Sequence, residues 1–447
     1  MIPAIGSEIE IAIDGLDLDG TGVGRRAGLE VRVARALPGD RVRARIEGVS
    51  RHQPTAFASL IEIVAPAPGR RPSPCPVSDR CDGCALIELD QPAQASAKLE
   101  LLRRQLSGVL PDALLPDRVV ETPPALGYRR RAKFVVARVD GAVRLGAYAR
   151  RSHRFVPTEP CPVVTPAIAS ALPAIATAIE RQDVAIAADG QPGLRYLQLR
   201  GSDRGELLVT LVSHQPSGPL QRAADDIARD VPSVTGVTLD LNPSSGDAIL
   251  AGQGRLLAGR GELIDTVAGV PVALGPYDFV QLHGPAGDRL GQSVADLITT
   301  ASPGPVIDLF SGVGALAFAI ALRGRRTIAV ERQRSALRAG RAAAQRARLE
   351  IEHAAADGAE FLSGLAASGM APPVIVVDPP RRGLTDDALR ALLALPAHRL
   401  IYVSCWPRAL ARDLQRLSAG GYRALAVEAH DLFPQTPAVE ALVELGR

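Results

Sequence analysis

The sequence contains no uninterrupted run of about 18 apolar residues, which is the length that a helix needs to cross a membrane. Its first residues, Met1–Ala4, also lack the basic and apolar regions of a signal peptide. We therefore expect a cytoplasmic protein without a membrane partner. Thiols stay reduced in the cytoplasm, so grouped cysteines indicate metal ligands or catalytic groups rather than disulfides.

Lysine is scarce, and so is net charge. Lys98 and Lys133 are the only lysines, and 51 basic against 48 acidic side chains leave a net charge of +3. Internal repeats and low-complexity tails are absent. With 447 residues, 47% of them hydrophobic and 22% charged, the chain has enough apolar material for about two to four globular domains.

Positive charge is nevertheless concentrated in residues 128–154, which we call the basic stripe. It holds nine positive side chains and, among acids, Asp140 alone. A general preference for arginine explains the choice of Arg but not this lack of acids, so the stripe favours a nucleic acid as partner. Its members are Arg129, Arg130, Arg131, Lys133, Arg138, Arg144, Arg150, Arg151 and Arg154.

Three regions differ in their patterns, and together they predict a multidomain α/β protein. Residues 1–66 contain short apolar runs between turns rich in Gly, Asp and Pro, which predicts a small β-barrel. Residues 67–270 contain the cysteine segment, helices around 91–110 and 164–182, and otherwise strand-like sequence. The helix at 91–110 is a candidate to pack with the last region rather than with its own. In residues 271–447 apolar strands alternate with helical sequence, which predicts a parallel, doubly wound sheet. The expected strands are 9–13, 29–33, 41–46 and 58–64 in the first region and 306–307, 327–330, 374–377 and 400–403 in the last.

The five cysteines divide into a group of four and a single thiol. The group has the number of thiolates that either zinc or an iron–sulfur cluster needs, so the spacing alone leaves the metal open. The single thiol, Cys405, follows an apolar strand directly. A lone cysteine is most often a core residue, but Asp378 is expected at the same edge of the sheet, which favours a nucleophile. The group of four is Cys75, Cys81, Cys84 and Cys161.

The segment 308–314, Asp-Leu-Phe-Ser-Gly-Val-Gly, lies between an expected strand and an expected helix, where glycines let the backbone approach a ligand. Residues 312–317 also fit a dinucleotide-binding loop, so a nicotinamide dehydrogenase and a plain tight turn both stay open at this point. The segment 378–381, Asp-Pro-Pro-Arg, at a later strand end is instead typical of methyltransferases that act on nucleobases.

A thiol, a carboxylate and a methyl donor together suit methylation of uracil at C5. That carbon is too weak a nucleophile on its own, but attack of a thiolate on C6 gives it carbanion character, and a base then removes the C5 proton. Glu440 lies in an otherwise apolar run and is the candidate base, because a buried carboxylate can have a raised pKa. The simpler alternative places Glu440 on a solvated face together with Glu444.

Over essentially its whole length the sequence resembles the bacterial RNA uracil-5-methyltransferase family, most closely the iron–sulfur branch that methylates 23S ribosomal RNA. The cysteine spacing, the segment 128–133 and the Ser404-Cys405 pair carry the resemblance. It implies a TRAM domain, an OB-like RNA-binding barrel, at 1–66, a central iron–sulfur domain at 67–270 and a Rossmann-like methyltransferase domain at 271–447. RNA is the implied partner, and we expect a monomer.

The resemblance also implies the site residues. Cys405 corresponds to the nucleophile and Glu440 to the general base. The implied ligands of a [4Fe–4S] cluster are Cys75, Cys81, Cys84 and Cys161. The implied contacts of S-adenosylmethionine are Gln281, Phe310, Glu331, Asp357 and Asp378. The sequence departs from the family pattern at His283, Ala315, Trp406, Gln435 and Ala438.

Two alternatives to the ribosomal enzyme stay open. One is the transfer-RNA member of the same chemistry, which generally lacks the cluster and the barrel. The other is an RNA-binding or redox-sensing homologue that has lost catalysis, which the departures near the site keep open.

Overall fold

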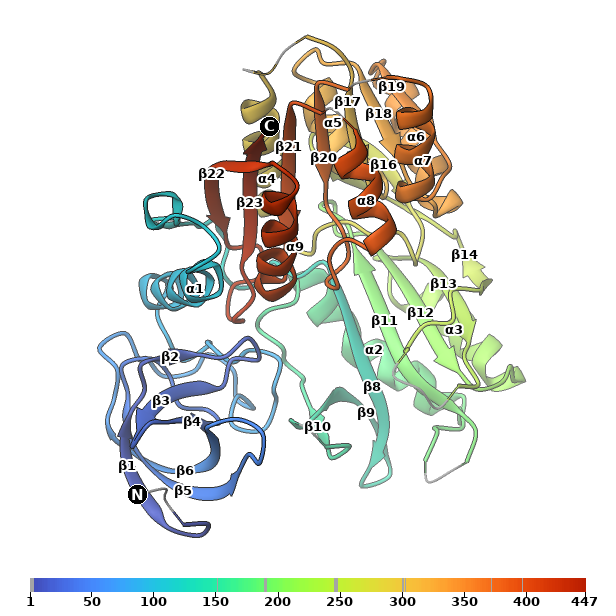
Figure 1. Cartoon of the computed structure of the whole chain (residues 1–447). Helices are drawn as coiled ribbons and strands as arrows, with labels where there is room; N and C mark the ends of the chain where they lie inside the picture. Colours follow the sequence, from blue (N-terminus) through green and yellow to red (C-terminus); the bar gives the residue numbers. More distant parts are fainter. Residues whose placement is uncertain are drawn as a thin grey trace.

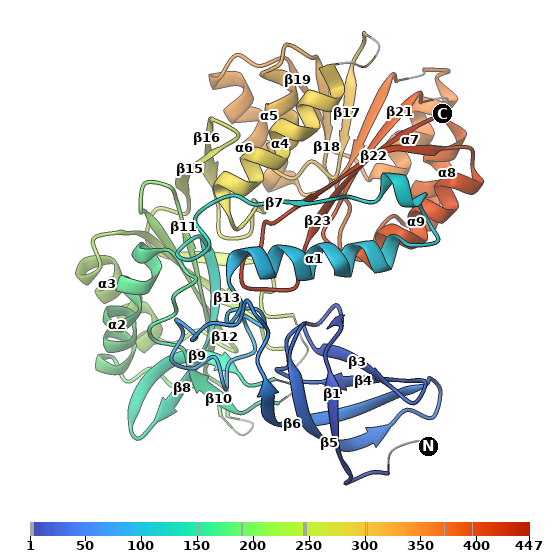
Figure 2. The same cartoon turned by 90° about the vertical axis from the view of Figure 1, so that its left-hand side faces the viewer.

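Three large β-sheets organise the chain in this computed structural model (Figures 1 and 2). The structure describes residues 4–150, 152–188, 191–244, 248–299, 301, 303–370, 372–395 and 397–447. Met1–Pro3 of the N-terminal segment and Arg151 of the basic stripe therefore lie outside the described residues. Within the described part, no helix has the length and apolar character needed to cross a membrane.

The first sheet has six strands in the order β1-β5-β6-β4-β3-β2 and curls around its own core (Figure 1). Ile11, Val33 and Ile46 are among the buried side chains that fill it. The four strands expected here are present, but β2 and β3 were missed because Gly22 and Gly24 interrupt the apolar alternation. Those glycines let backbones meet: a Cβ at Gly24 would lie 2.1 Å from the Ala12 carbonyl oxygen. The bounds are β1 Glu8–Ala12, β2 Gly15–Leu16, β3 Gly22–Arg26, β4 Leu29–Val33, β5 Arg41–Val49 and β6 Thr55–Ala65.

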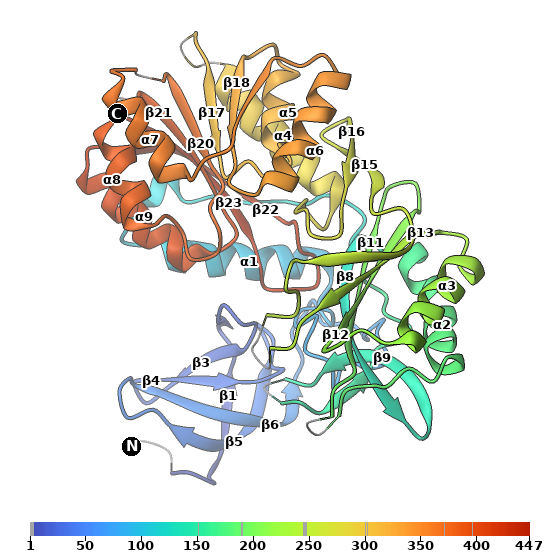
Figure 3. The ribbon, with the colours of Figure 1, turned by 90° about the vertical axis from the view of Figure 1, so that its right-hand side faces the viewer.

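The second sheet has seven strands in the order β10-β9-β8-β11-β12-β13-β14. Helices α2 (Pro166–Arg181) and α3 (Gly218–Asp230) cover one of its faces (Figure 3). Their apolar sides share one core with alternate residues of the strands, such as Phe134 and Leu197. The bounds are β8 Arg131–Val139, β9 Ala142–Tyr148, β10 Phe155–Pro157, β11 Leu194–Gly201, β12 Leu207–Ser213, β13 Val234–Leu241 and β14 Gly254–Gly259.

The third sheet has eight strands in the order β19-β18-β17-β20-β21-β23-β22-β7. Strands β17 to β21 are parallel and carry helices on both faces, as the alternating pattern predicted. Strand β23 runs antiparallel to both β21 and β22, so the sheet is mixed rather than wholly parallel. The strand bounds are β17 Val306–Leu309, β18 Thr327–Val330, β19 Ile351–Ala354, β20 Val374–Val377, β21 Arg399–Ser404, β22 Arg423–His430 and β23 Glu440–Gly446. The helix bounds are α4 Gly284–Thr299, α5 Ala315–Ala321, α6 Arg334–Arg346, α7 Gly358–Ala367, α8 Asp386–Ala394 and α9 Pro407–Ala419.

Two earlier segments pack with this third sheet. Helix α1 (Gln91–Leu106) lies along α9 and β23, and β7 (Val119–Val120) adds the last strand beside β22 (Figure 2). The hairpin of β15 (Leu263–Val267) and β16 (Val270–Leu274) packs against α6. The expected border between residues 270 and 271 falls inside this hairpin, so we propose to place it before Leu263.

Buried polar contacts fasten α1 to the segment that leads into β23. Lys98 Nζ lies 2.6 Å from Asp431 Oδ1, and both side chains are almost fully buried. Gln94 Nε2 donates to Gln435 Oε1 at 2.9 Å, and the Gln435 backbone N–H donates to Gln94 Oε1 at 2.8 Å. The departure from the family pattern at Gln435 therefore has a structural role, because this side chain holds the approach to Glu440 in place.

Candidate active site

The residues expected at the active site meet at one edge of the third sheet. Asp378 follows β20 and Cys405 follows β21, and these two parallel strands are neighbours. Strand β23 pairs antiparallel with β21, with Ala441 opposite Ser404, so Glu440 lies beside Cys405. The carboxyl ends of parallel strands are where ligands bind in such sheets. The fold thus brings a thiol and two carboxyls from distant parts of the sequence together.

Cys405 lies in a partly buried, acidic environment. Burial, followed by the charges of the Glu440 and Asp378 carboxyls, raises the pKa of its thiol to about 12, and Arg381 opposes this rise through its charge and a hydrogen bond. Arg381 also lies over the Trp406 ring, 5.9 Å from its centroid. Arg381 is not among the residues predicted for the site, although its position in the segment 378–381 places it close to Asp378 in the sequence.

Glu440 is buried, with an exposed fraction of 1%. Its Oε2 atom has no hydrogen-bond partner among the described residues. Burial raises its pKa well above the ordinary value, Asp378 adds to the effect, and Arg381 opposes it. Glu444 instead pairs with Arg399 at 2.9 Å, so the alternative of one solvated face for both glutamates is wrong.

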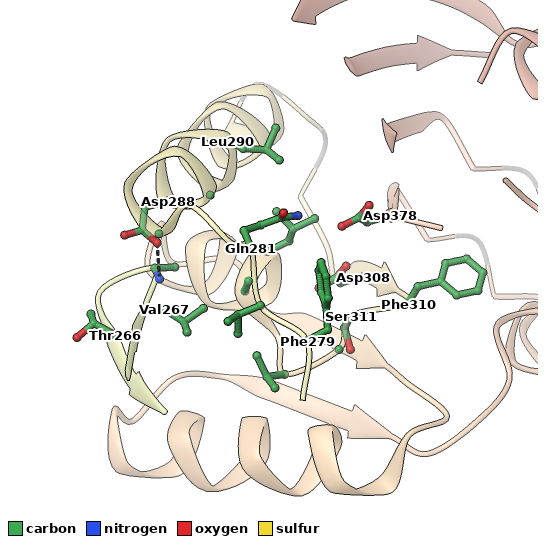
Figure 4. Close-up of a pocket in the computed structure, with 18 residues that line it drawn as sticks. Thr266, Val267, Phe279, Gln281, Asp288, Leu290, Asp308, Phe310, Ser311 and Asp378 are labelled. Atoms are coloured by element: carbon green, nitrogen blue, oxygen red, sulfur yellow. Dashed lines mark hydrogen bonds between the residues drawn. The ribbon is translucent and has the colours of Figure 1, made fainter. Parts of the chain in front are cut away.

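A cavity lies beside this group and is drawn in Figure 4. Gln281, Phe310 and Asp378 line it, and the side chains of Gln281 and Asp378 point toward one another while the Phe310 ring points away. Three buried atoms of its wall, Gln281 Oε1, Asp308 Oδ1 and Ser311 Oγ, have no partner in the part of the chain that the structure describes. Buried polar atoms are normally hydrogen-bonded, so these three indicate a polar ligand.

Two carboxyls of the cavity wall, those of Asp378 and Asp308, have raised pKa values. Burial raises the pKa of Asp378 to about 7. Burial, followed by the charge of Asp378, raises the pKa of Asp308 well above its ordinary value. Asp308 was missed as a site residue, although a carboxylate inside the four-residue buried strand β17 was a signal for it.

Glu331 and Asp357 do not line this cavity and lie beside it. Glu331 Oε2 accepts a hydrogen bond of 3.0 Å from the Gly312 backbone N–H, which fixes the glycine loop. Asp357 is exposed and caps α7 by accepting from the Ala359 N–H at 2.9 Å. The Phe310 ring packs against Gly358, the residue after Asp357, where a Cβ would approach the ring to 3.2 Å.

His283, another departure from the family pattern, is a buried structural residue. Its ring stacks on Tyr128 with 4.8 Å between centroids. Its Nε2 atom lies 3.0 Å from the Thr122 carbonyl oxygen and 3.1 Å from that of Pro124. These contacts join the linker before the basic stripe to the start of α4.

The four grouped cysteines come together on the central region. Burial raises the pKa of Cys75 and Cys81, and it raises that of Cys84 to about 12. Cys161 lies close enough to these three thiols to contribute to the raised pKa of each of them. Among the described residues, however, no three such side chains converge tightly enough to hold one metal ion.

The basic stripe divides into engaged and exposed members. Arg130 Nη1 lies 2.9 Å from Asp265, and Arg150 Nη2 lies 2.6 Å from Asp19 of the first region. Arg129 is held near Cys84, and Arg131 lies 5.3 Å from the centroid of the Phe279 ring. The exposed members are Lys133, Arg138, Arg144 and Arg154.

Comparisons with known proteins show the family of the chain. Residues 288–447 match the model of the tRNA (uracil-5-)-methyltransferase family. An uncharacterized RNA methyltransferase of Thermosynechococcus vestitus is 33% identical over 452 residues, which cover 98% of each chain. Another, of Geobacter sulfurreducens, is 31% identical over 449 residues, covering 98% of this chain and 90% of the relative.

The fold is also that of a solved enzyme. The Pyrococcus abyssi tRNA (uracil-54, C5)-methyltransferase, in complex with S-adenosyl-L-homocysteine, superposes with a TM-score of 0.76 at 23% identity. The match covers 98% of this chain and 100% of that one. The matched family and the relatives define an RNA methyltransferase. The chain belongs to the RNA uracil-5-methyltransferase family.

Proposed function

We propose that this enzyme methylates C5 of uridine in RNA, with Cys405 as nucleophile, Glu440 as general base and S-adenosylmethionine as methyl donor. The observation that carries the proposal is a group of four side chains beside a cavity with unpartnered polar atoms. In this group Glu440 is buried, Cys405 and Asp378 are partly buried, and Arg381 is exposed. The donor supplies an electrophilic methyl group when it is bound.

The chain's own residues account for the remaining steps. The Cys405 thiolate attacks C6 of the target uracil, and the resulting carbanion character at C5 lets that carbon take the methyl group. The Glu440 carboxylate removes the C5 proton, and elimination then releases the thiolate and restores the C5–C6 double bond. Arg381 favours the thiolate of Cys405 electrostatically, against burial and two carboxyls.

We propose that the donor's polar groups satisfy the wall of the cavity. Gln281 and Asp378 then contact the methionine part, and Phe310 and Asp357 lie on the adenine side. Each Glu331 oxygen accepts one backbone hydrogen bond, from Gly312 and from Gln333. Because a carboxylate oxygen has two lone pairs, Glu331 still has capacity to accept from ribose hydroxyls.

A pH dependence of donor binding follows from Asp378. Its pKa is raised to about 7 by burial, so the free enzyme protonates it below that pH. A bound sulfonium favours the ionised form, so binding must release this proton below pH 7. We expect the association constant, measured by calorimetry, to rise up to about tenfold per pH unit below 7 and to level off above it. Asp378→Asn should remove that slope, and a wild-type affinity independent of pH would contradict the role of Asp378.

Ribosomal RNA is the proposed substrate, and we propose a [4Fe–4S] cluster on the four cysteines and a TRAM-like role for the first region. The four gathered thiols would supply the four thiolates that such a cluster needs, and the resemblance of the cysteine spacing to the iron–sulfur branch supports this assignment. Anaerobically purified protein should contain iron and acid-labile sulfide in equal amounts, and zinc alone would contradict the cluster.

Transfer RNA is the second candidate, because the matched family and the superposed enzyme carry that substrate in their names. Release of tritium from RNA labelled at uridine C5 tests the reaction itself. Comparing ribosomal and transfer RNA in that assay, and mapping 5-methyluridine in cells with and without the gene, identifies the substrate. RNA binding without tritium release from either RNA would favour the homologue that has lost catalysis.

A further inference from the structure

The central sheet leaves part of one face uncovered. Helices α2 and α3 cover the opposite face. On the uncovered face, residues of β8, β9 and β11 line a hollow with a volume of about 720 Å³. Nothing in the proposed reaction uses this hollow, which we call the sheet groove.

Aromatic rings are concentrated in the sheet groove, although only 3% of the chain is aromatic. Tyr148 has an exposed fraction of 37%, and its hydroxyl is hydrogen-bonded to that of Tyr196. The His153 ring lies edge-on to Tyr148, with 5.3 Å between centroids. The Arg195 guanidinium lies over Tyr196, 5.1 Å from the ring centroid. Exposed rings of this kind are platforms on which nucleobases stack.

The charge of the sheet groove is positive. Lys133 and Arg195 line it, and no carboxylate does so among the described residues. Burial, followed by the charge of Arg131, lowers the pKa of Lys133. An anion placed beside Lys133 would relieve this repulsion, as RNA phosphates do in basic grooves.

Strand β8 connects the sheet groove with the surroundings of the candidate active site. Arg131, Lys133 and Val135 occupy every second position of β8, so their side chains lie on one face of the sheet, with about 7 Å between successive members. Arg131 lies against Phe279, which lines the methyl-donor cavity and is 49% exposed. Farther across the sheet, the segment around Pro276 covers the same face, and Gln198 Nε2 donates a hydrogen bond of 2.9 Å to the Pro276 carbonyl oxygen.

We propose that the sheet groove binds a single-stranded RNA segment next to the target uridine, with bases stacked on Tyr148 and Tyr196 and phosphates beside Lys133 and Arg195. This inference rests on the proposed function and extends it to a second contact with the substrate. Single-stranded rather than duplex RNA is the fitting ligand, since only unpaired bases present their faces to aromatic side chains.

Fluorescence anisotropy with a labelled, unstructured RNA of about 12 nucleotides tests the proposal. Tyr148→Ala should weaken binding about 5- to 150-fold, whereas Tyr148→Phe, which keeps the ring, should bind like wild type. Lys133→Gln should lower the slope of log affinity against log salt by about 0.7. Arg138→Gln, on the same strand but with the opposite parity, should leave the slope unchanged.

Three outcomes would overturn the inference: wild-type affinity in Tyr148→Ala, an unchanged salt slope in Lys133→Gln, or a matched duplex bound as tightly as the single strand. Lys133 is exposed, so its substitution removes no core contact, and a changed salt slope in Lys133→Gln is not explained by misfolding. Tritium release by the same variants separates the two proposals. If the wild-type enzyme is active and the groove variants keep its KM for RNA, the groove proposal is wrong and the proposed function stands. If the wild-type enzyme is inactive, the proposed function is wrong.

Discussion

Cys405→Ala should lower methyl transfer to RNA by more than about 10⁴-fold, because no other group of the described site can add to C6 of uracil. Without that addition C5 keeps its weak nucleophilicity, however well donor and RNA are bound. The loss should appear in kcat, measured as transfer of a labelled methyl group to RNA. Donor affinity should change little, since Cys405 does not line the donor cavity.

Cys405→Ser is the sharper control, because it nearly keeps the size of the side chain and replaces the thiol with a hydroxyl. A hydroxyl ionises far less readily than a thiol, so this variant should be almost as inactive as Cys405→Ala. Neither variant should change the iron content expected from the proposed cluster, because Cys405 follows β21 of the third sheet, whereas the grouped cysteines lie outside its strands, in the central region. Methyl transfer at the wild-type rate by Cys405→Ala would refute the covalent mechanism while leaving the family membership intact.

The strands that end at the site could be predicted from the sequence because each contains a short apolar run. Strands β18 and β20 begin and end where the pattern placed them. Strand β7 could not be predicted, since two residues carry no periodicity and its partner β22 lies about 300 residues further along the chain. Contacts between residues far apart in the sequence also hold α1 against the third sheet, where Leu102 and Leu106 belong to the same core.

The sequence names the candidate residues of the site and predicts that Asp378 and Cys405 share one edge of the sheet, but the pattern does not place Glu440 beside Cys405. Cys405 and Glu440 become neighbours only through the antiparallel register of β21 and β23, which the sequence pattern does not encode. For the basic stripe the sequence overestimates the number of free positive charges, because a count of charges ignores the ion pairs that they form. Arg130 and Arg150 are bound to aspartates, so fewer members face solvent than the stripe implied.

Glu440→Gln should stop the reaction after methyl transfer, with the RNA still covalently attached to Cys405. The amide keeps the shape of the carboxylate but cannot take the C5 proton, so elimination should slow by about 10²- to 10⁴-fold. Addition of the thiol should not slow, because the Glu440 carboxyl raises the pKa of Cys405 and its removal favours the thiolate. A denaturing gel should then show protein bound to RNA that carries the labelled methyl group.

Glu444→Gln supplies the matched control, four residues along the same strand. Glu444 pairs with Arg399 rather than facing Cys405, so its substitution should leave turnover unchanged and trap no RNA. The double variant Cys405→Ala, Glu440→Gln should also trap no RNA, because the adduct needs the thiol. If Glu440→Gln turns over at the wild-type rate, another base removes the proton, and Asp378 is then the nearest candidate, since its charge acts on both Cys405 and Glu440. Trapping by Glu440→Gln alone, among these three variants, would place the proton abstraction at Glu440 and the covalent bond at Cys405.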